Sequence, residues 1–321
     1  AEEFTQASCG PCAAANPAFN ALLANNSAKV VAIKYQVSWP GVDPMNAQYG
    51  FQVQNRVNYY GVQGVPHALL DGADVLGPNY AGHPANCTQT MINNQYAWPS
   101  SFTIDVSHVF NAAMDSIFVT AVITSSQAYT ATGFLRAHVV MIEKHIDFAS
   151  PPGSNGETDF YGVCRKMFPT ASGNTLPATW ASGATQTLTI ASSVPTYIYD
   201  LNEIAIVCFI QDNGNKEVQQ AAISLSPVGI ADFNSTNTGI SLFPNPANQT
   251  TSIKFTLTQG SDVVLNIYNA VGQLVSTENK GTYAVGEQSI LLGTEMLENG
   301  MYVIELVSEG SKSVTRLNVH H

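Results

Sequence analysis

The sequence predicts a multidomain protein that combines one α/β segment with two all-β segments. In residues 1–98, stretches with helical periodicity alternate with short apolar strand patterns, which is typical of an α/β layer fold. Residues 99–228 and residues 240–319 each carry a series of strand patterns. The polar stretch at residues 229–239 between them is expected to be a linker. A chain of 321 residues has room for two or three domains of this kind.

The first segment opens with EEFT, which resembles a short strand, and continues with alternating helices and strands. The first helical pattern places Ala15, Phe19 and Leu22 on one face. The predicted order after EEFT is helix, strand, helix, strand and helix, in the stretches AAANPAFNALL from Ala13, KVVAIKYQV from Lys29, NAQYGFQVQNRVNYYG, VPHALLDG, and NCTQTMINNQYAW from Asn86.

The second segment predicts a β-sandwich domain. Its strands are expected in SFTIDVSHVF, SIFVTAVITS, FLRAHVVMIEKHIDF, TQTLTIAS, EIAIVCFIQD and EVQQAAISLS. The stretch DNGN at 212–215 predicts a hairpin turn between the last two strands. Residues 147–185 are rich in Gly, Pro and Ser and have little strand pattern, so we expect a surface excursion or a functional loop there.

The third segment predicts a small Ig-like sandwich. It begins with ISLFPNPANQTTSIKFTL and continues with VVLNIYNAVGQLVSTE, QSILLG, GMYVIELVSEG and SKSVTRLNV. These stretches alternate apolar and polar residues at short spacing, and Gly falls at the expected turns.

The composition excludes several classes of partner. The net charge of −11 argues against nucleic acid, which needs clustered Lys and Arg, and against electrostatic attachment to anionic lipid. No apolar run is long enough to predict a transmembrane segment, and no signal peptide is visible in this sequence. Charged residues make up only 11% of the chain, which is typical of secreted and surface proteins with Ser- and Thr-rich strands.

Two cysteines near the start of the chain, Cys9 and Cys12, are separated by Gly10 and Pro11. The helical pattern directly after Cys12 puts Cys9 at a helix N-terminus, where free N–H groups and partial positive charge lower a thiol pKa. Cys12, one turn inside the helix, is positioned to resolve a mixed disulfide. The pattern on its own fits a redox pair, half of a metal site, or a structural disulfide.

A zinc site would need two further Cys or His ligands at compatible spacing. The chain has no second CxxC, and His67 and His83 lack ligand spacing, so no metal site is predicted. We found no phosphate-binding loop and no Ser–His–Asp order, and no cofactor is expected. Cys208 lies in the apolar run IAIVCFI, which predicts a small buried side chain, and the pairing of Cys87 and Cys164 stays open.

The CGPC motif, together with two other features, resembles the thioredoxin family. Gly10 and Pro11 are the pair that thioredoxin itself carries, and Pro17 stands where that family has its kink proline. The stretch GVQGVPHALLDG at 61–72 is similar to the family segment with a cis-proline opposite the active site. The resemblance implies that Pro66 is cis and that the Val65 backbone binds an extended substrate peptide.

The same resemblance implies a role for an acid. Glu3 falls where thioredoxin-like proteins keep a buried acid that helps to deprotonate the second cysteine. Ser8 is a departure from the family, because many thioredoxins have Trp at this position, so substrate contact and local packing are expected to differ.

Two further resemblances concern the location of the protein. Residues 1 to about 227, through EEFT, YQVSWPGVDPMN, RVNYYGVQGVP and CRKMFP, are similar to the outer-membrane-protein-28-related proteins, which are secreted or surface proteins. Residues 240–319, through FPNPANQTT, VLNIYNAVGQLV and GMYVIELVSEGSKSVTRLNV, resemble the type A sorting domain of type IX secretion. This implies export across the outer membrane by the type IX translocon and its shuttle and attachment machinery, so the protein is expected on the cell surface or outside the cell.

These observations support two hypotheses about function. In the first, the chain is an extracellular thiol–disulfide oxidoreductase: Cys9 attacks, Cys12 resolves, and Gly10, Pro11, Val65 and Pro66 contact the disulfides of proteins or peptides. In the second, the chain is a surface binding or structural protein, and the Cys9–Cys12 disulfide is inert. Fold does not decide between them.

Overall fold

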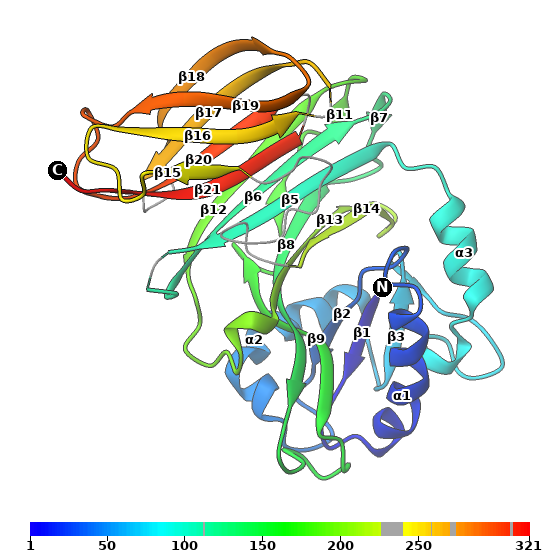
Figure 1. The fold of residues 1–321 in the computed structure, drawn as a ribbon. Helices are drawn as coiled ribbons and strands as arrows, with labels where there is room; N and C mark the ends of the chain where they lie inside the picture. The colour runs from blue at the N-terminus through cyan, green and yellow to red at the C-terminus, as the bar shows by residue number, and fades with distance from the viewer. Residues whose placement is uncertain (112, 226–239, 258, 270–273, 309–310) are drawn as a thin grey trace. The chain divides into compact units, whose positions relative to one another are not determined.

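The computed structural model describes the chain except for residues 112, 226–239, 258, 270–273 and 309–310. The expected linker at 229–239 therefore lies outside the described residues. Two compact units are present: residues 1–108 with 119–227, and residues 109–118 with 228–321. The fold is mostly β, and the α-helices of the described residues all fall before residue 98 (Figure 1).

A mixed sheet of nine strands forms the centre of the first unit. Eight of the strands lie in the order β14-β13-β8-β9-β2-β1-β3-β4, and β10 pairs with β8. The bounds are β1 Glu2–Thr5, β2 Ile33–Gln36, β3 His67–Leu70, β4 Ala73–Asp74, β8 Leu135–Asp147, β9 Asp159–Phe168, β10 Asn174–Thr175, β13 Ile204–Asp212 and β14 Val218–Ser224. The sheet passes from the first segment of the sequence to the second between β2 and β9, which pair in parallel at Lys34 and Val163. The domain boundary at residues 98/99 stays a prediction.

Strand β9 corrects the expectation for residues 147–185. These residues are not an excursion without strands, because β9 occupies the middle of the nine-stranded sheet between β8 and β2. Its sequence DFYGVCRKMF contains a glycine and adjacent basic residues, which hide the strand pattern. Arg165 of β9 is fully buried and pairs with the buried Glu143 of β8, Nε to Oε2 2.9 Å apart. The ion pair allows a charged residue inside a central strand.

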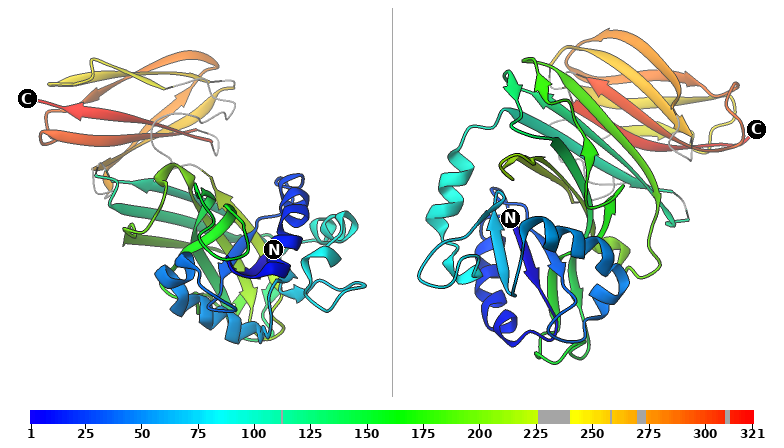
Figure 2. Two further views of the ribbon diagram at one scale, coloured as in Figure 1. Left: turned by 90° about the horizontal axis from the view of Figure 1, so that it is seen from below. Right: turned by 180° about the vertical axis from the view of Figure 1, so that it is seen from behind.

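The three α-helices are α1 Gly10–Ala24, α2 Pro44–Tyr60 and α3 Gln89–Ala97, and short 3-10 turns lie at Pro84–Asn86 and Leu201–Glu203. Helices α1 and α2 lie on opposite sides of the β1–β2–β3 part of the sheet (Figures 1 and 2). Phe19 and Leu23 of α1 pack with Leu70 of β3 on one side. No helix in the described part of the chain is long and apolar enough to cross a membrane.

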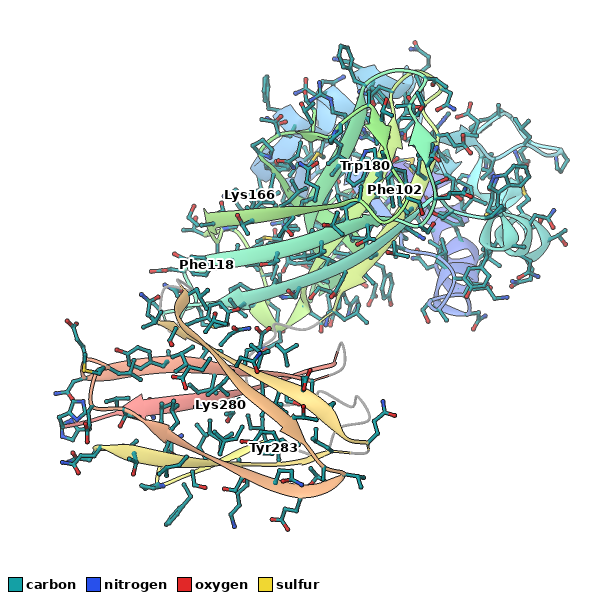
Figure 3. All side chains as sticks on the ribbon, turned by 90° about the horizontal axis from the view of Figure 1, so that it is seen from above. Phe102, Phe118, Lys166, Trp180, Lys280 and Tyr283 are labelled. Atoms are coloured by element: carbon teal, nitrogen blue, oxygen red, sulfur yellow. A yellow bond between two sulfur atoms is a disulfide. The ribbon has the colours of Figure 1, made fainter. Side chains whose placement is uncertain are left out.

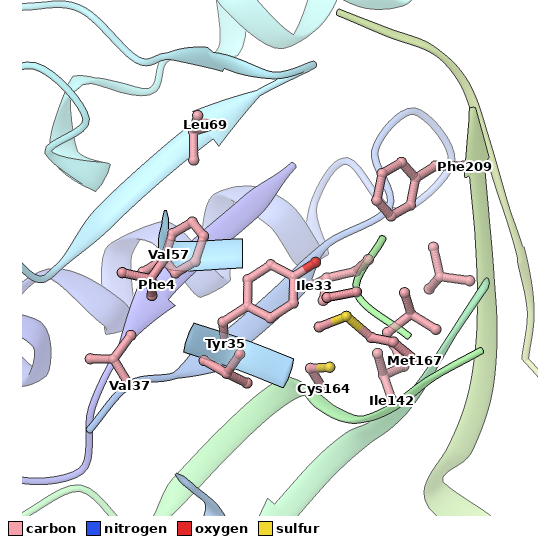
Figure 4. Packing of buried hydrophobic residues seen from close by; sticks show 14 of the residues in the cluster. Phe4, Ile33, Tyr35, Val37, Val57, Leu69, Ile142, Cys164, Met167 and Phe209 are labelled. Atoms are coloured by element: carbon pink, nitrogen blue, oxygen red, sulfur yellow. The ribbon is translucent and has the colours of Figure 1, made fainter. Parts of the chain in front are cut away.

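Helix α2 covers the larger hydrophobic core. Val57 of α2 packs there with Phe4 of β1 and Tyr35 of β2 (Figure 4). The core continues across the sheet to Cys164 of β9 and Phe209 of β13. One apolar cluster thus joins the strands of the first two sequence segments, and its burial stabilises both together.

Shorter sheets form a second layer, and all of it except residues within 109–118 belongs to the first unit. Its strands are β5 Phe102–Phe110, β6 Ser116–Ser125, β7 Tyr129–Thr130, β11 Thr179–Trp180 and β12 Thr185–Ser193, in the orders β12-β6-β5 and β11-β7. Phe102 of β5 and Trp180 of β11 meet edge to face, with ring centroids 5.3 Å apart (Figure 3). These rings pack with Ile210 of β13, so this layer shares a core with the nine-stranded sheet.

The second unit contains two antiparallel sheets in the orders β15-β16-β19 and β18-β17-β20-β21. The strands are β15 Ser241–Phe243, β16 Thr250–Leu257, β17 Ser261–Asn269, β18 Leu274–Tyr283, β19 Gly286–Gly293, β20 Gly300–Ser308 and β21 Ser311–Val319. Alternating side chains such as Ile253, Leu265 and Ile304 are buried in a core common to both sheets. Tyr283, labelled in Figure 3, packs at the edge of this core against Phe255.

Candidate functional site

The two cysteines of the CxxC motif form a disulfide at the start of α1. Cys9 is the N-cap of the helix, and Gly10 and Pro11 begin its first turn. The backbone N–H of Cys12 donates a hydrogen bond to Cys9 Sγ over 3.1 Å. A sulfur at this position receives an N–H bond and the partial positive charge of the helix N-terminus, both of which favour a thiolate when the pair is reduced.

The loop before β3 lies opposite the disulfide. The Val65–Pro66 peptide bond is cis, as the family resemblance implied. The carbonyl oxygen of Val65 lies 3.6 Å from Cys9 Sγ, and Pro66 is buried beside it. The hydroxyl of Tyr80 donates a hydrogen bond to the Pro66 carbonyl over 2.6 Å, which holds the loop in place. The structure therefore brings Cys9, Cys12, Val65 and Pro66 into one site.

Glu3 lies on β1, directly before the segment that leads to Cys9. Its side chain is 1% exposed and forms an ion pair with Lys34 of β2. Glu3 and Lys34 are opposite each other in the parallel β1–β2 register. The acid expected from the family resemblance is thus buried, and a cation neutralises its charge.

A second, half-buried acid, which the sequence did not indicate, lies closer to the motif along the hydrogen-bond network. Glu157 accepts a hydrogen bond from Asn16 of α1 over 2.7 Å and one from Asn155 over 2.6 Å. Asn155 also donates to the carbonyl of Cys9 over 3.2 Å. Burial raises the pKa of Glu157. These contacts join residues about 145 positions apart, a distance at which no sequence spacing can signal them.

The disulfide is covered. Cys9 is 1% exposed and Cys12 is fully buried, although Gly10 and Pro11 between them are exposed. The Val65 carbonyl lies against Cys9 Sγ, and the loop before α2 and the loop between β8 and β9 contact the backbone around Cys9. Ser8, at the position where many thioredoxins have Trp, lies between these two loops.

The remaining cysteines, Cys87, Cys164 and Cys208, are free and buried. Burial raises the pKa of each thiol, to about 12 for Cys208. This confirms that Cys208 is a buried side chain inside a strand. In the described part of the chain, no group of three or more His, Cys, Asp and Glu side chains gathers in a way that could hold a metal ion.

A cleft of about 800 Å³ lies beside α1, but the cysteines do not line it. Its walls include Pro17 and Leu23 of α1, Lys34 of β2, and Glu157 and Tyr161 next to and within β9. The half-buried Glu157 in this wall is connected through Asn155 to the Cys9 carbonyl.

Comparison with known proteins identifies the end of the chain. Residues 241–320 match the family model described as the secretion system C-terminal sorting domain. No curated protein matches the chain. The sorting domain marks the chain as cargo of type IX secretion, so the protein is exported to the cell surface or secreted, and residues 240–319 interact with that secretion machinery.

The solved structures that resemble the chain include two from Porphyromonas gingivalis. HBP35 of Porphyromonas gingivalis has a TM-score of 0.52 and 15% identity, over 99% of this chain and 97% of that one. A domain of the outer membrane lipoprotein Omp28 from Porphyromonas gingivalis has a TM-score of 0.28 and 15% identity, over 40% of this chain and 93% of that one. At these identities, the likeness to HBP35 shows a shared fold alone.

Proposed function

We propose that the protein catalyses thiol–disulfide exchange on extracellular or surface proteins through Cys9 and Cys12. The observation that carries the proposal is the position of Cys9 Sγ, which receives the Cys12 N–H at 3.1 Å and lies 3.6 Å from the Val65 carbonyl. One neighbour stabilises a thiolate, and the other offers the backbone of an extended loop to a substrate. A structural disulfide needs neither of them.

The chain order of the first segment supports a thioredoxin-like domain over residues 1–98. Strands β2, β1 and β3 are adjacent, with β1 parallel to β2 and antiparallel to β3, and β4 follows at the edge. The motif follows β1 and begins α1, and Pro66 immediately precedes β3. We also propose a β-sandwich domain over 99–228, related to the outer-membrane-protein-28 group, and an Ig-like form for 240–319.

In the oxidised form, the exchange starts when a substrate thiolate attacks Cys9 Sγ. A mixed disulfide forms, the Cys9–Cys12 bond breaks, and Cys12 leaves as a thiolate that takes up a proton. The second thiol of the substrate then attacks the substrate sulfur that is bonded to Cys9 Sγ. A substrate disulfide forms, and Cys9 leaves as a thiolate that takes up a proton. The substrate dithiol loses two electrons and two protons, which the CxxC pair gains, and the reverse sequence reduces a substrate disulfide.

The other predicted residues have supporting roles in this proposal. Exposed Gly10 and Pro11 contact the substrate beside the sulfur, and the Val65 backbone pairs with a substrate peptide as an added strand. In the direction that reduces a substrate, Glu3 accepts the proton of Cys12, and its burial on β1 supports this role. Lys34 forms a buried ion pair with Glu3.

A second candidate function, a binding or structural protein with an inert disulfide, is favoured by one observation. Cys9 is 1% exposed and Cys12 is fully buried, so a protein substrate has no direct contact with the sulfurs.

A redox equilibrium with glutathione, together with a titration of the Cys9 thiol in the reduced protein, separates the two candidates. Exchange activity predicts a depressed Cys9 pKa and a reduction potential above about −270 mV. A Cys9 thiol with an ordinary pKa, in a disulfide that glutathione does not reduce, would support the inert alternative. The Cys164→Ala variant is the matched control, since it removes a buried thiol outside the site.

A further inference from the structure

Two loops meet at Ser8, the residue before Cys9, and its hydroxyl joins them. The Ser8 hydroxyl donates a hydrogen bond to the Val42 carbonyl over 2.7 Å. The same oxygen accepts a hydrogen bond from the Ser154 N–H over 3.0 Å. Val42 belongs to the loop before α2, and Ser154 belongs to the loop between β8 and β9. Ser8 thus connects both loops to the residue that precedes Cys9.

Both loops approach the motif so closely that only glycine fits at the points of contact. A Cβ atom on Gly153 would lie 2.1 Å from the carbonyl oxygen of Ala7, which is backbone and cannot turn away. A Cβ atom on Gly41 would lie 2.7 Å from Ser8 Cβ. A larger residue at Gly153 would therefore lift its loop away from the motif.

Asn155 extends the contact to Cys9 itself. Its backbone N–H donates to the Ala7 carbonyl over 3.3 Å, and its side chain donates to the Cys9 carbonyl over 3.2 Å. Residues 153–155, which we call the cover segment, thus lie along the backbone from Ala7 to Cys9. The exposed Ser154 and the half-buried Asn155 make these contacts at the surface, where a short segment can move without disturbing the core.

We propose that the cover segment is a gate, that Ser8 is its latch, and that thiol–disulfide exchange takes place only when the segment leaves the motif. The regulation rests on the exchange function proposed above, whereas the gate itself can be measured with any small reductant. In the closed state, the 1% exposure of Cys9 leaves an attacking sulfur no path to the disulfide. The observed rate of attack is then the intrinsic rate multiplied by the open fraction.

The same geometry explains why serine occupies the position before Cys9. Val42, Ser154 and the contact points at Gly41 and Gly153 surround Ser8. Serine is small enough for the loops to close and has a hydroxyl that can donate to one loop and accept from the other.

The test is the rate at which dithiothreitol reduces the disulfide in the full chain, followed by mass spectrometry after alkylation. Ser8→Ala removes both latch bonds without adding bulk and is expected to increase the rate about tenfold. Gly153→Ala forces the segment away and is expected to increase the rate by at least as much. Ser150→Ala, an exposed position outside the cover segment on the same loop, is the control and should leave the rate unchanged.

Wild-type and Ser8→Ala rates within twofold of each other would overturn the gate, as would a wild-type rate equal to that of a short unfolded CGPC peptide. Thermal unfolding by circular dichroism shows whether Gly153→Ala is folded, and Ser8→Ala keeps the test valid if it is not. The reduction potential against glutathione is measured separately. If dithiothreitol reduces Ser8→Ala faster but the reduction potential of the disulfide lies far below that of glutathione, the gate is supported and the exchange function is contradicted. If the two reduction rates are equal and the reduction potential lies in the range that exchange requires, the exchange function is supported and the gate is contradicted.

Discussion

The cysteines at the start of α1 and those of the central sheet are equally buried, but their surroundings are opposite. Cys9 and Cys12 are 1% and 0% exposed, and Cys164 and Cys208 are 3% and 0% exposed. Cys9 Sγ accepts an N–H bond at a helix N-terminus, whereas burial among apolar side chains raises the pKa of Cys164 and Cys208. Exposure alone therefore does not separate a redox cysteine from a structural one, and the nearby donors and backbone dipoles do.

The residues that bury Cys9 and Cys164 also differ. Cys164 lies beside Ile142 and Met167 inside the core, where opening requires the sheet to come apart (Figure 4). The segment that we propose as the cover of Cys9 lies at the surface and is held to Ser8 and Cys9 by a few hydrogen bonds. Local opening costs far less free energy than global unfolding, so two equally buried sulfurs can differ greatly in reactivity.

The strongest test of this comparison is to remove one cysteine from each region. In Cys12→Ser, Cys9 still attacks a substrate disulfide, but no thiol remains to resolve the mixed disulfide. Turnover is expected to fall below detection, while covalent complexes on Cys9 accumulate. A coupled assay with a disulfide peptide measures turnover, and non-reducing mass spectrometry identifies the complexes.

The matched variant Cys164→Ala removes a sulfur from the core and should keep full turnover per folded molecule. The comparison between the regions breaks if Cys164→Ala loses turnover as Cys12→Ser does. If folded Cys12→Ser accumulates no covalent complexes on Cys9, the exchange function is contradicted and the inert disulfide is supported.

The second prediction concerns the rate of alkylation. After mild reduction at pH 8, iodoacetamide should label Cys9 at least about a hundredfold faster than Cys208, because Cys9 becomes accessible by local opening and its thiolate is stabilised. Cys208 has a pKa of about 12 and becomes accessible only when β13 separates from its neighbours. Peptide mapping over time measures both rates, and labelling of Cys208 within tenfold of Cys9 would contradict the distinction.

Much of this contrast could be predicted from the sequence, because its signals are local. The CxxC motif, the helix after it and the apolar run around Cys208 each lie within about fifteen residues. Local patterns of this kind determine helix N-termini and buried strands through periodicity. They predicted Cys9 at a helix N-terminus and the burial of Cys208, and the family resemblance implied the cis bond before Pro66; the structure confirms all three.

The cover over Cys9 could not be predicted, because it comes from a segment about 145 residues away. Residues 153–155 reach the motif only because β9 adds to the sheet beside β2, and the sequence of β9 hides its strand pattern behind Gly162 and Arg165. The error over residues 147–185 and the missed role of Asn155 thus have one cause. A strand whose charge is balanced by Glu143 across the sheet does not look like a buried strand in isolation.

The third prediction concerns stability in the core alone. Cys208→Ser places a hydroxyl inside β13, where the environment of the sulfur is apolar, and should lower the free energy of unfolding by about 1–3 kcal/mol. Urea unfolding followed by tryptophan fluorescence measures this, since Trp39, Trp98 and Trp180 all lie in the first unit. The redox equilibrium of Cys9 and Cys12 should not change. A shift in that equilibrium would show that the two regions are coupled.

The last and smallest expected effect is the pH dependence of stability. An unfolded cysteine loses its proton near pH 8.5, whereas folded Cys208 keeps its proton up to about pH 12. The stabilising contribution is complete below pH 8.5 and decreases above it, by up to about 1.4 kcal/mol per pH unit. Cys208→Ala removes this contribution, so its stability should fall less steeply than that of the wild type between pH 9 and pH 11.

Val207→Ala, a buried neighbour without an ionisable group, should lower stability but keep the wild-type slope. If unfolding free energy changes with pH at the same slope in all three proteins, Cys208 ionises as freely in the folded protein as in the unfolded chain. The difference in reactivity between Cys9 and Cys208 would then come from the accessibility of the sulfur alone.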